Sequence, residues 1–301
     1  MLHPLKFTSL ISFTTVLACG GQQGSPISET NCATSSVEGY RTIVQDDITR
    51  EYILHTPSGY DGSSAVPLVI AFHGNDGCAD QFASTEAQLA STADSSGFLL
   101  AYPQGIARAK GGTEWDPGDD GTTNISTNDL AFTDAIIADI SSAYSVEPSQ
   151  IYAVGYSNGG MMAYGLACRR GAQIAAAGIM SGTMLPGECD AENYTSILHF
   201  HGTADDSLPY NGSQEYQSMA DVMSFWVSHN SISNTTPATT DLGGGVTKDE
   251  YTGGSEDTSV VLYTIQDGGH IWFNESMGGE APNQILWHFL SRYNLNGLTA
   301  E

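Results

Sequence analysis

The sequence predicts a doubly wound α/β fold, with a mostly parallel sheet of eight strands and helices on both faces. Short apolar and β-branched runs recur along the chain, and helical patterns lie between them. The middle runs are apolar without alternation, which is typical of parallel strands that are covered on both faces. The expected strands are Thr42–Gln45, Tyr52–His55, Leu68–Phe72, Phe98–Tyr102, Ile151–Tyr156, Ala175–Met180, Ile197–Phe200 and Ser259–Ile265.

Helical spacing of apolar residues predicts the elements between the strands. The clearest pattern has Phe132, Ile136 and Ile140 following the polar start Asn128-Asp129. Three further helices are expected, within 161–168, 216–227 and 285–293, and Pro282 lies near the first turn of the last one. The Gly-rich stretches 111–121 and 243–254 are expected to be loops by composition. No Pro/Gly linker divides the chain, so residues 39–296 are expected to form one domain.

The N-terminal residues 1–19 are typical of an export signal. Lys6 precedes an apolar run, Leu10 to Leu17, that is too short to span a bilayer. Residues 16–19 read Val-Leu-Ala-Cys and resemble a bacterial lipobox, in which cleavage precedes a cysteine that is then acylated; Cys19 is therefore the expected lipidation site. The alternative is ordinary secretion with cleavage near Ala18. The following Gly-, Ser-, Gln- and Thr-rich residues predict a flexible tether over 20–38.

The charge balance excludes some classes of partner. Nine Lys plus Arg against 34 Asp plus Glu give a formal net charge of −25. Nucleic acid is excluded because phosphate binding needs clustered cations. Beyond the N-terminal region, no apolar stretch reaches the roughly 18 residues of a membrane helix. We therefore expect an exported monomer, extracellular or in the cell envelope, that contacts a membrane only through a lipid at Cys19.

Four cysteines remain when Cys19 is set aside, and an even number in an oxidising compartment favours two disulfides. No CxxC or HxxxH spacing supports zinc, so no metal site is predicted. Three pairings are possible. We favour Cys168 with Cys189, which are close in sequence, and this leaves Cys32 with Cys78.

The most specific feature is the hexapeptide Gly155-Tyr-Ser-Asn-Gly-Gly160, which lies between an expected strand and an expected helix. A G-x-S-x-G sequence in that context builds a nucleophile elbow, with the serine exposed at the carboxyl edge of the sheet. The glycines are needed because larger side chains two residues before and after Ser157 would collide with the neighbouring strand and helix. A phosphate-binding glycine turn is the alternative, but no Lys or acidic ribose partner accompanies it. We therefore interpret Ser157 as a nucleophile.

A serine nucleophile needs a base and a carboxylate that orients the base. In this fold the chain order is Ser, acid, His. His270 is the best candidate for the base because it follows the last strand in a Gly-supported loop, Gly268-Gly269-His270. The acid is Asp205 or Asp206, which follow the strand that ends at Phe200.

The oxyanion formed by attack on a carbonyl needs two hydrogen-bond donors. We predict the backbone N–H of Asn158, directly after the nucleophile, and that of Asn75 in the loop after Leu68–Phe72. Gly74 permits a close approach of this loop. His73 could act as a second base, but we favour a supporting role in which backbone hydrogen bonds hold its ring under the loop.

Four segments together resemble the polyhydroxybutyrate depolymerase/feruloyl esterase group of α/β-hydrolases, which includes lipoproteins. They are AFHG at 71–74, YSNGGMM at 156–162, HGTAD at 201–205 and GGHIW at 268–272. The resemblance implies an α/β-hydrolase fold and selects Asp205 as the acid. It also implies extracellular hydrolysis of polymer or phenolic esters by a serine esterase without a cofactor.

Three functional hypotheses follow. The first is an esterase acting through an acyl-enzyme on hydroxyalkanoate, acetyl (as in acetyl xylan esterases) or feruloyl esters. The second is a peptidase, and the third is a surface binding protein that has lost activity, since fold alone does not prove function. For the substrate cleft we predict two aromatic walls, Trp115 in the long loop 103–128 and Trp272 two residues after His270.

Overall fold

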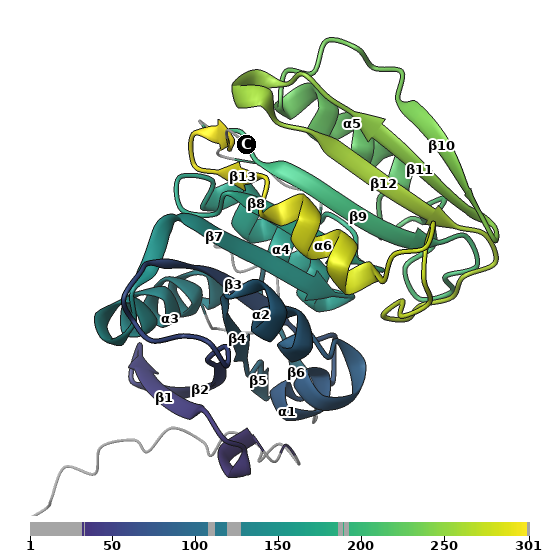
Figure 1. Cartoon of the computed structure of the whole chain (residues 1–301). Helices are drawn as coiled ribbons and strands as arrows, with labels where there is room; N and C mark the ends of the chain where they lie inside the picture. Colours follow the sequence, from purple (N-terminus) through teal and green to yellow (C-terminus); the bar gives the residue numbers. More distant parts are fainter. Residues whose placement is uncertain are drawn as a thin grey trace, which may run out of the picture.

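A ten-stranded sheet runs through the middle of the protein (Figure 1). The structure is a computed structural model that describes residue 32 and residues 34–107, 112–118, 128–185, 189 and 193–299. The strand order is β1-β2-β4-β3-β7-β8-β9-β12-β11-β10. The strands are β1 (Tyr40–Gln45), β2 (Ile48–His55), β3 (Val66–Phe72), β4 (Leu99–Pro103), β7 (Val146–Tyr156), β8 (Ala176–Met180), β9 (Ser196–Gly202), β10 (Ala238–Gly243), β11 (Val246–Tyr251) and β12 (Val260–Ile265).

The centre of the sheet is parallel and its two margins are antiparallel. Strands β4, β3, β7, β8, β9 and β12 pair in parallel, whereas β1 and β2 on one side and β11 and β10 on the other pair antiparallel. Every residue of β4, β8 and β9 is buried. This agrees with the unalternating apolar runs, because a central parallel strand is covered on both faces. All eight predicted strands are present.

Helices cover both faces of the sheet, as predicted. Buried residues of α3, α4 and α5 pack in one apolar core, and those of α1, α2 and α6 pack in the other. The helices are α1 (Ala79–Gln81), α2 (Ala90–Ser96), α3 (Asp129–Ala143), α4 (Asn158–Arg169), α5 (Met219–His229) and α6 (Pro282–Leu290). Asn128 caps α3 by accepting a hydrogen bond from the Ala131 amide at 2.8 Å, and Pro282 begins α6. The fold is that of an α/β-hydrolase.

Both expected Gly-rich loops contain strands. Residues 243–254 include β11, which forms a hairpin with β10 at the margin of the sheet. Almost all of β10 is exposed, so its residues need no apolar pattern, and composition alone could not reveal the strand. Within 111–121, Thr113–Glu114 (β6) pairs with Ile106–Ala107 (β5).

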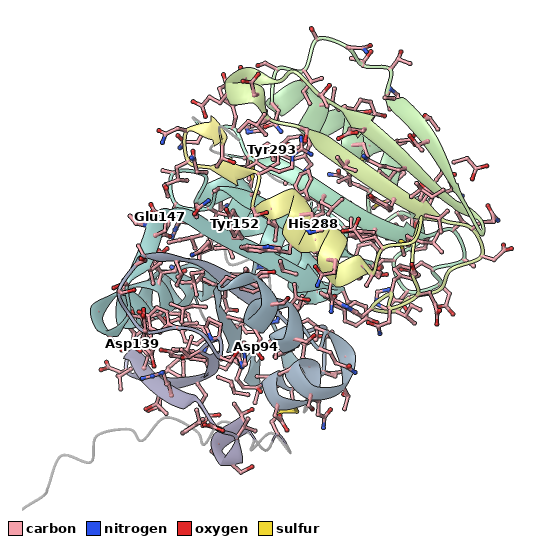
Figure 2. The ribbon with its side chains drawn as sticks, in the orientation of Figure 1. Asp94, Asp139, Glu147, Tyr152, His288 and Tyr293 are labelled. Atoms are coloured by element: carbon pink, nitrogen blue, oxygen red, sulfur yellow. A yellow bond between two sulfur atoms is a disulfide. The ribbon has the colours of Figure 1, made fainter. Side chains whose placement is uncertain are left out.

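The packed domain is longer than 39–296 at both ends. Thr34–Ser36 form a 3₁₀ turn, and buried Thr34 donates to the Gln104 side chain at 2.9 Å, so the end of the predicted tether belongs to the domain. At the other end, β13 (Tyr293–Asn294) pairs with β14 (Gly297–Leu298). Figure 2 labels Tyr152 and Tyr293, where the Tyr152 hydroxyl donates to the Tyr293 carbonyl at 2.7 Å.

The predicted signal peptide, 1–19, and its lipidation site Cys19 lie outside the described residues. The same is true of the tether from residue 20 to residue 31. Among the residues that the structure does describe, no helix has the length and apolar character needed to cross a bilayer.

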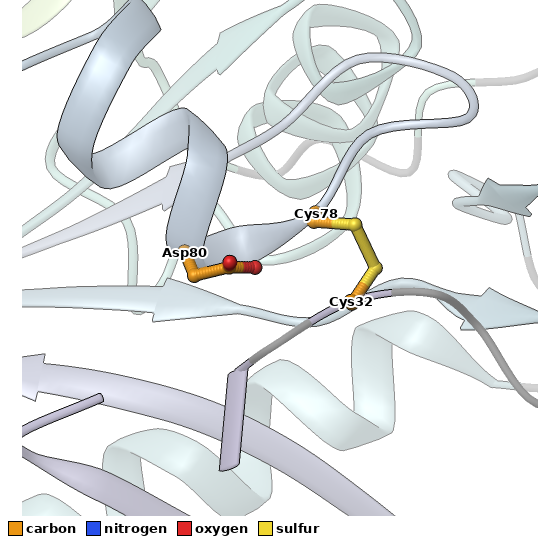
Figure 3. Close-up of side chains that lie close together, drawn as sticks. All are labelled: Cys32, Cys78 and Asp80. Carbon is orange, nitrogen blue, oxygen red and sulfur yellow. A yellow bond between two sulfur atoms is a disulfide. The ribbon is translucent and has the colours of Figure 1, made fainter. Parts of the chain in front are cut away.

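Both favoured disulfides are formed. Cys32 is bonded to Cys78 with 5.4 Å between their Cα atoms, and Cys168 is bonded to Cys189 at 5.0 Å. Figure 3 shows the first bond beside Asp80, at the start of α1. The ligand atoms of Cys32, Cys78 and Asp80 lie close together, as in a metal site. The two sulfurs are bonded to each other, however, so no thiolate is left there to bind a metal ion. The bond fastens the chain at Cys32 to the end of the loop that follows β3.

Candidate active site

Ser157 occupies a sharp turn between β7 and α4. Its backbone has φ 55° and ψ −120°, a conformation that L residues rarely adopt. A Cβ atom at Gly155 would lie 1.9 Å from the Gly159 carbonyl oxygen, and one at Gly159 would lie 2.2 Å from that of Phe72. Only glycine fits at either position. The sequence prediction about these two glycines is therefore confirmed in atomic terms.

Three parallel strands bring Ser157, Asp205 and His270 together. They follow β7, β9 and β12, whose carboxyl ends lie at one edge of the sheet. His270 Nε2 lies 2.8 Å from Ser157 Oγ, and His270 Nδ1 lies 2.8 Å from Asp205 Oδ2. The carboxylate can only accept at Nδ1, so Nδ1 carries the proton. The Nε2 lone pair then faces the serine hydroxyl and can receive its proton.

Asp205 is buried and its carboxylate is surrounded by donors. Its Oδ1 atom accepts hydrogen bonds from the amides of Ser207 at 3.0 Å and Leu208 at 2.8 Å. Burial alone raises the pKa of Asp205, but the hydrogen bonds from His270 and the Leu208 amide outweigh it and lower the pKa overall. Asp205 thus stays ionised. Asp206 is exposed and does not contact His270 in the structure.

The two predicted oxyanion donors belong to residues that line the same cavity as Ser157. Asn158 is the first residue of α4, and the first-turn amides of a helix have no intrahelical acceptor. The first amide that bonds back within this turn is that of Met161, which donates to the Ser157 carbonyl at 3.1 Å. Asn75 lies across the cavity in the loop after β3. The site thus offers backbone donors from two segments.

His73 supports this loop and is not a second base. Its ring is 1% exposed. Nε2 accepts a hydrogen bond from the Gly105 amide at 2.9 Å, so Nδ1 carries the proton and donates to the Gly74 carbonyl at 2.7 Å. Burial lowers the pKa of His73 to about 4, and the ring is neutral at physiological pH. The supporting role favoured from the sequence is confirmed.

A cavity of about 420 Å³ opens onto Ser157 Oγ. It is lined by Asn75, Glu114, Tyr156, Ser157, Asn158, Met161, Ser207, Leu208, Tyr216 and His270. The Tyr156 hydroxyl donates to the His270 carbonyl at 2.9 Å and so holds the histidine loop as well as one wall. An acyl group bound here would meet aromatic, aliphatic and amide surfaces.

Neither predicted tryptophan wall is correct. Trp115 is 1% exposed, and its indole N–H donates to the His73 carbonyl at 2.9 Å. Trp272 is 6% exposed, packs edge-on against Phe82 and donates to the Asn283 side chain at 3.2 Å. Both rings pack under their loops and do not face water, and each has an acceptor within the protein for its N–H.

The actual lining residues were partly visible in the sequence. Tyr156, Ser207 and Leu208 are neighbours of Ser157 or Asp205 in the chain, and Met161 is one helical turn beyond Ser157. Helical spacing predicts that Tyr216 belongs to the helix at 216–227, whereas α5 begins only at Met219. No local pattern separates this tyrosine from a core residue. Glu114 lies in β6, within the segment 103–128 that is predicted to border the cleft, but the prediction names Trp115 instead of this neighbour.

The fold and the Ser157–His270–Asp205 geometry define a serine hydrolase of the α/β-hydrolase class. The family model described as "Esterase PHB depolymerase" matches residues 50–222, and the chain belongs to this family. It is 28% identical over 252 residues to feruloyl esterase C of Emericella nidulans, covering 80% of this chain and 83% of that protein. It is 30% identical over 247 residues to the probable feruloyl esterase C of Aspergillus niger, with the same two shares.

A solved structure gives the same fold. The acetyl xylan esterase from Aspergillus awamori superposes with a TM-score of 0.65, covering 84% of this chain and 98% of that one, at 14% sequence identity. At this identity the likeness concerns the fold alone. The family and its relatives make the protein a serine carboxylic ester hydrolase, and an ester is its substrate.

Proposed function

We propose that Ser157, His270 and Asp205 are the catalytic triad of this esterase. The observation that carries the proposal is the continuous hydrogen-bond chain from Ser157 Oγ through His270 to Asp205, with 2.8 Å at each step. His270 Nε2 takes the hydroxyl proton as Oγ attacks the ester carbonyl carbon, and the amides of Asn75 and Asn158 bind the resulting oxyanion.

The remaining steps use the same groups. The protonated His270 gives its proton to the leaving alkoxide, and the ester C–O bond breaks to leave an acyl-enzyme on Ser157. Water then attacks the acyl carbonyl, with Nε2 taking its proton and returning it to Oγ as the acid product departs. Asp205 remains ionised throughout and stabilises the imidazolium that forms twice in the cycle.

We further propose that the acyl group is aromatic, of the feruloyl type. Tyr156 and Tyr216 line the cavity, and Met161 adds a polarisable thioether that packs well against aromatic rings. The net charge of −25 favours a neutral ester over an anionic ligand and also favours departure of the carboxylate product. The two feruloyl esterases described above align with 80% of this chain.

Steady-state kinetics on three substrates test the acyl preference. We expect kcat/KM for methyl ferulate to exceed that for hydroxybutyrate trimers and for acetylated xylan. Tyr216→Ala should raise KM for methyl ferulate and spare hydrolysis of p-nitrophenyl acetate. Tyr194→Ala, which changes a tyrosine before the opposite end of β9, is the matched control. Preference for the trimer or the acetylated polymer would replace the feruloyl assignment and leave the triad untouched.

The protein is proposed to work outside the cytoplasm, attached by a lipid at Cys19. The two disulfides support export, because such bonds persist in oxidising compartments. Thiol titration of the denatured, unreduced protein is expected to find no free cysteine among residues 32–189. Detergent partition of the native protein and of Cys19→Ala then separates a lipid anchor from ordinary secretion.

A further inference from the structure

Trp115 lies between the two segments that carry the proposed oxyanion donors. The Asn158 side chain clasps its backbone from one side: Asn158 Oδ1 accepts from the Trp115 amide at 2.7 Å, and Asn158 Nδ2 donates to the Trp115 carbonyl at 3.2 Å. Because this side-chain amide bonds to both the N–H and the C=O of one residue, the backbone of that residue cannot shift relative to Asn158 without loss of a hydrogen bond. Trp115 is thereby tied to the start of α4.

The indole of Trp115 reaches the other segment. Its N–H donates to the His73 carbonyl at 2.9 Å, and its ring packs edge-on against Phe72 with centroids 5.2 Å apart. The loop after β3 is also bonded to the β5–β6 pair, because the Asp76 amide donates to the Thr113 carbonyl at 2.7 Å. The segment Thr113–Trp115 therefore bridges Asn158 and the loop at 73–77.

The geometry of the peptide unit carries these contacts to the Asn75 donor. The Gly74 carbonyl and the Asn75 N–H belong to one planar trans peptide and point in opposite directions. His73 Nδ1–H donates to that carbonyl at 2.7 Å and the Gly77 amide donates to it at 3.1 Å, so the direction of the Asn75 N–H depends in part on the position of His73. The indole bond to the His73 carbonyl fixes the adjoining peptide. Moving Trp115 must therefore tilt the Asn75 amide.

We propose that Trp115 is a positioning residue that sets the separation and aim of the two oxyanion donors, the amides of Asn75 and Asn158. The inference rests on the proposed function, because it assumes that these amides bind the oxyanion. Trp115 is not among the residues that line the cavity at Ser157. It acts through the Asn158 side chain on one side and through His73 on the other.

The test compares two buried tryptophans. Trp115→Phe removes the indole donor and keeps an aromatic ring. Trp226→Phe is the matched control: Trp226 is 0% exposed, and its indole nitrogen has no hydrogen-bond partner among the described residues, so this substitution trims an aromatic ring without removing a hydrogen bond. We expect Trp115→Phe to lower kcat for p-nitrophenyl acetate about tenfold or more, toward the 10²–10³ that follows loss of a whole oxyanion donor. KM and the pH dependence of kcat/KM should not change.

A transition-state analogue provides a second readout. An arylboronic acid forms a tetrahedral adduct with the serine, so its Ki should rise in Trp115→Phe by the factor by which kcat falls. Asn158→Ala keeps the backbone donor but loses both bonds to Trp115, and we expect the same pattern; it also serves if Trp115→Phe does not fold. Unchanged kcat and Ki in both variants, or equal losses in Trp226→Phe, would overturn the proposal. A failure of the triad itself appears separately, as activity retained in Ser157→Ala.

Discussion

The proposed active site has two sides, one with the proposed oxyanion donors and one with Asp205. Both rely on a buried histidine in the same way, but they hold opposite kinds of group. On the oxyanion side, His73 holds the Gly74 carbonyl. On the acid side, His201 Nε2 lies 2.8 Å from the Leu208 carbonyl oxygen. His73 directly follows β3, and His201 is the penultimate residue of β9. Each ring holds one carbonyl of the loop that comes after its strand. What the loops then present differs: backbone amides on one side, a carboxylate on the other.

The hydrogen bonds that begin at His201 continue through two further side chains. A carbonyl can only accept, so His201 Nε2 carries the proton and Nδ1 accepts from His199 Nε2 at 2.9 Å. His199 Nδ1 must then accept from the Tyr164 hydroxyl, at 2.6 Å. Burial lowers the pKa of both histidines, which keeps them neutral. Tyr164 lies on α4, so the helix that follows Ser157 is linked to the loop of Asp205.

This difference shows which side of the site depends on a charged group. On the oxyanion side the side chains that hold the proposed donors, His73 and Trp115, are neutral, so the function of these donors depends on the direction of backbone dipoles. The acid side is centred on ionised Asp205, whose Oδ2 lies 2.8 Å from His270 and 3.4 Å from His201 Nε2. A substitution that removes a charge without changing the shape of the side chain should therefore lower activity only on the acid side. A substitution that removes the serine hydroxyl should abolish the activity to which both sides contribute.

The largest effect is expected where the two sides meet. Ser157→Ala should lower kcat by a factor on the order of 10⁶ for the enzyme acting on p-nitrophenyl acetate, because the acid–base pair has no nucleophile to activate. The positive φ at Ser157 is unchanged by this substitution, and the fold should be retained in circular dichroism. Activity within tenfold of the parent enzyme would show that Ser157 is not the nucleophile.

Charge removal at Asp205 is the next largest change. Asp205→Asn keeps the shape of the side chain but favours the wrong tautomer of His270, which should cost about 10⁴ in kcat. Asp206→Asn is the control, since that exposed carboxylate does not contact the histidine, and its kcat should stay close to that of the parent. A greater loss in Asp206→Asn would mean that the acid side is built differently in solution.

How much of this was predictable depends on whether the cause is local. The Ser157 turn follows from its own glycines, and His270 follows from the order of parallel strands. The same order leaves Asp205 and Asp206 as alternatives for the acid, and only the family resemblance selects Asp205. The prediction that Trp115 and Trp272 line the cleft is wrong because the composition of a loop does not tell whether the protein offers an acceptor for the indole N–H beneath that loop. Tyr216 was missed because its pocket is made by residues distant in the chain.

The same reasoning explains the strands. Buried strands such as Ala176–Met180 are predicted from their continuous apolar residues. The hairpin of β10 and β11 was not predicted because β10 is almost wholly exposed and therefore carries Thr, Asp and Gly, which resemble a loop. Its place in the sheet is set by pairing with β12 through β11, a tertiary fact.

Acid should reveal the neutral histidine on the oxyanion side. The pKa of His73 falls from 6.5 to about 4 on folding, so below pH 6.5 the unfolded chain binds a proton that the folded chain does not. The free energy of unfolding should therefore decrease between pH 6.5 and pH 4, by up to about 3 kcal/mol from this residue. The contribution of Asp205 has its own window: its lowered pKa stabilises the fold above the unfolded value and is lost only below about pH 4.

Urea unfolding at several pH values measures this slope. His73→Gln should make the pH dependence between 6.5 and 4 less steep, whatever it does to stability at pH 7. The rest of the slope remains because the pKa values of His199 and His201 are lowered as well. The exposed His288 provides the control, because His288→Gln alters a ring that folding does not bury. An unaltered slope in His73→Gln would indicate that the ring is accessible to protons in the folded state.

The smallest effect is expected at Asn75, although it lies in the cavity. The proposed donor there is the backbone N–H, whose direction is set by His73 through the Gly74 carbonyl. Asn75→Ala keeps that N–H and removes only an exposed side chain, so kcat should change by less than about tenfold, well short of the 10²–10³ that follows loss of a donor. Asn158→Ala, which also keeps its N–H, should be the more damaging change because its side chain holds Trp115. Measuring both variants on p-nitrophenyl acetate decides the point: if Asn75→Ala lost as much as a missing donor, the side-chain amide of Asn75 would itself bind the oxyanion, and the purely backbone character of this side would be wrong.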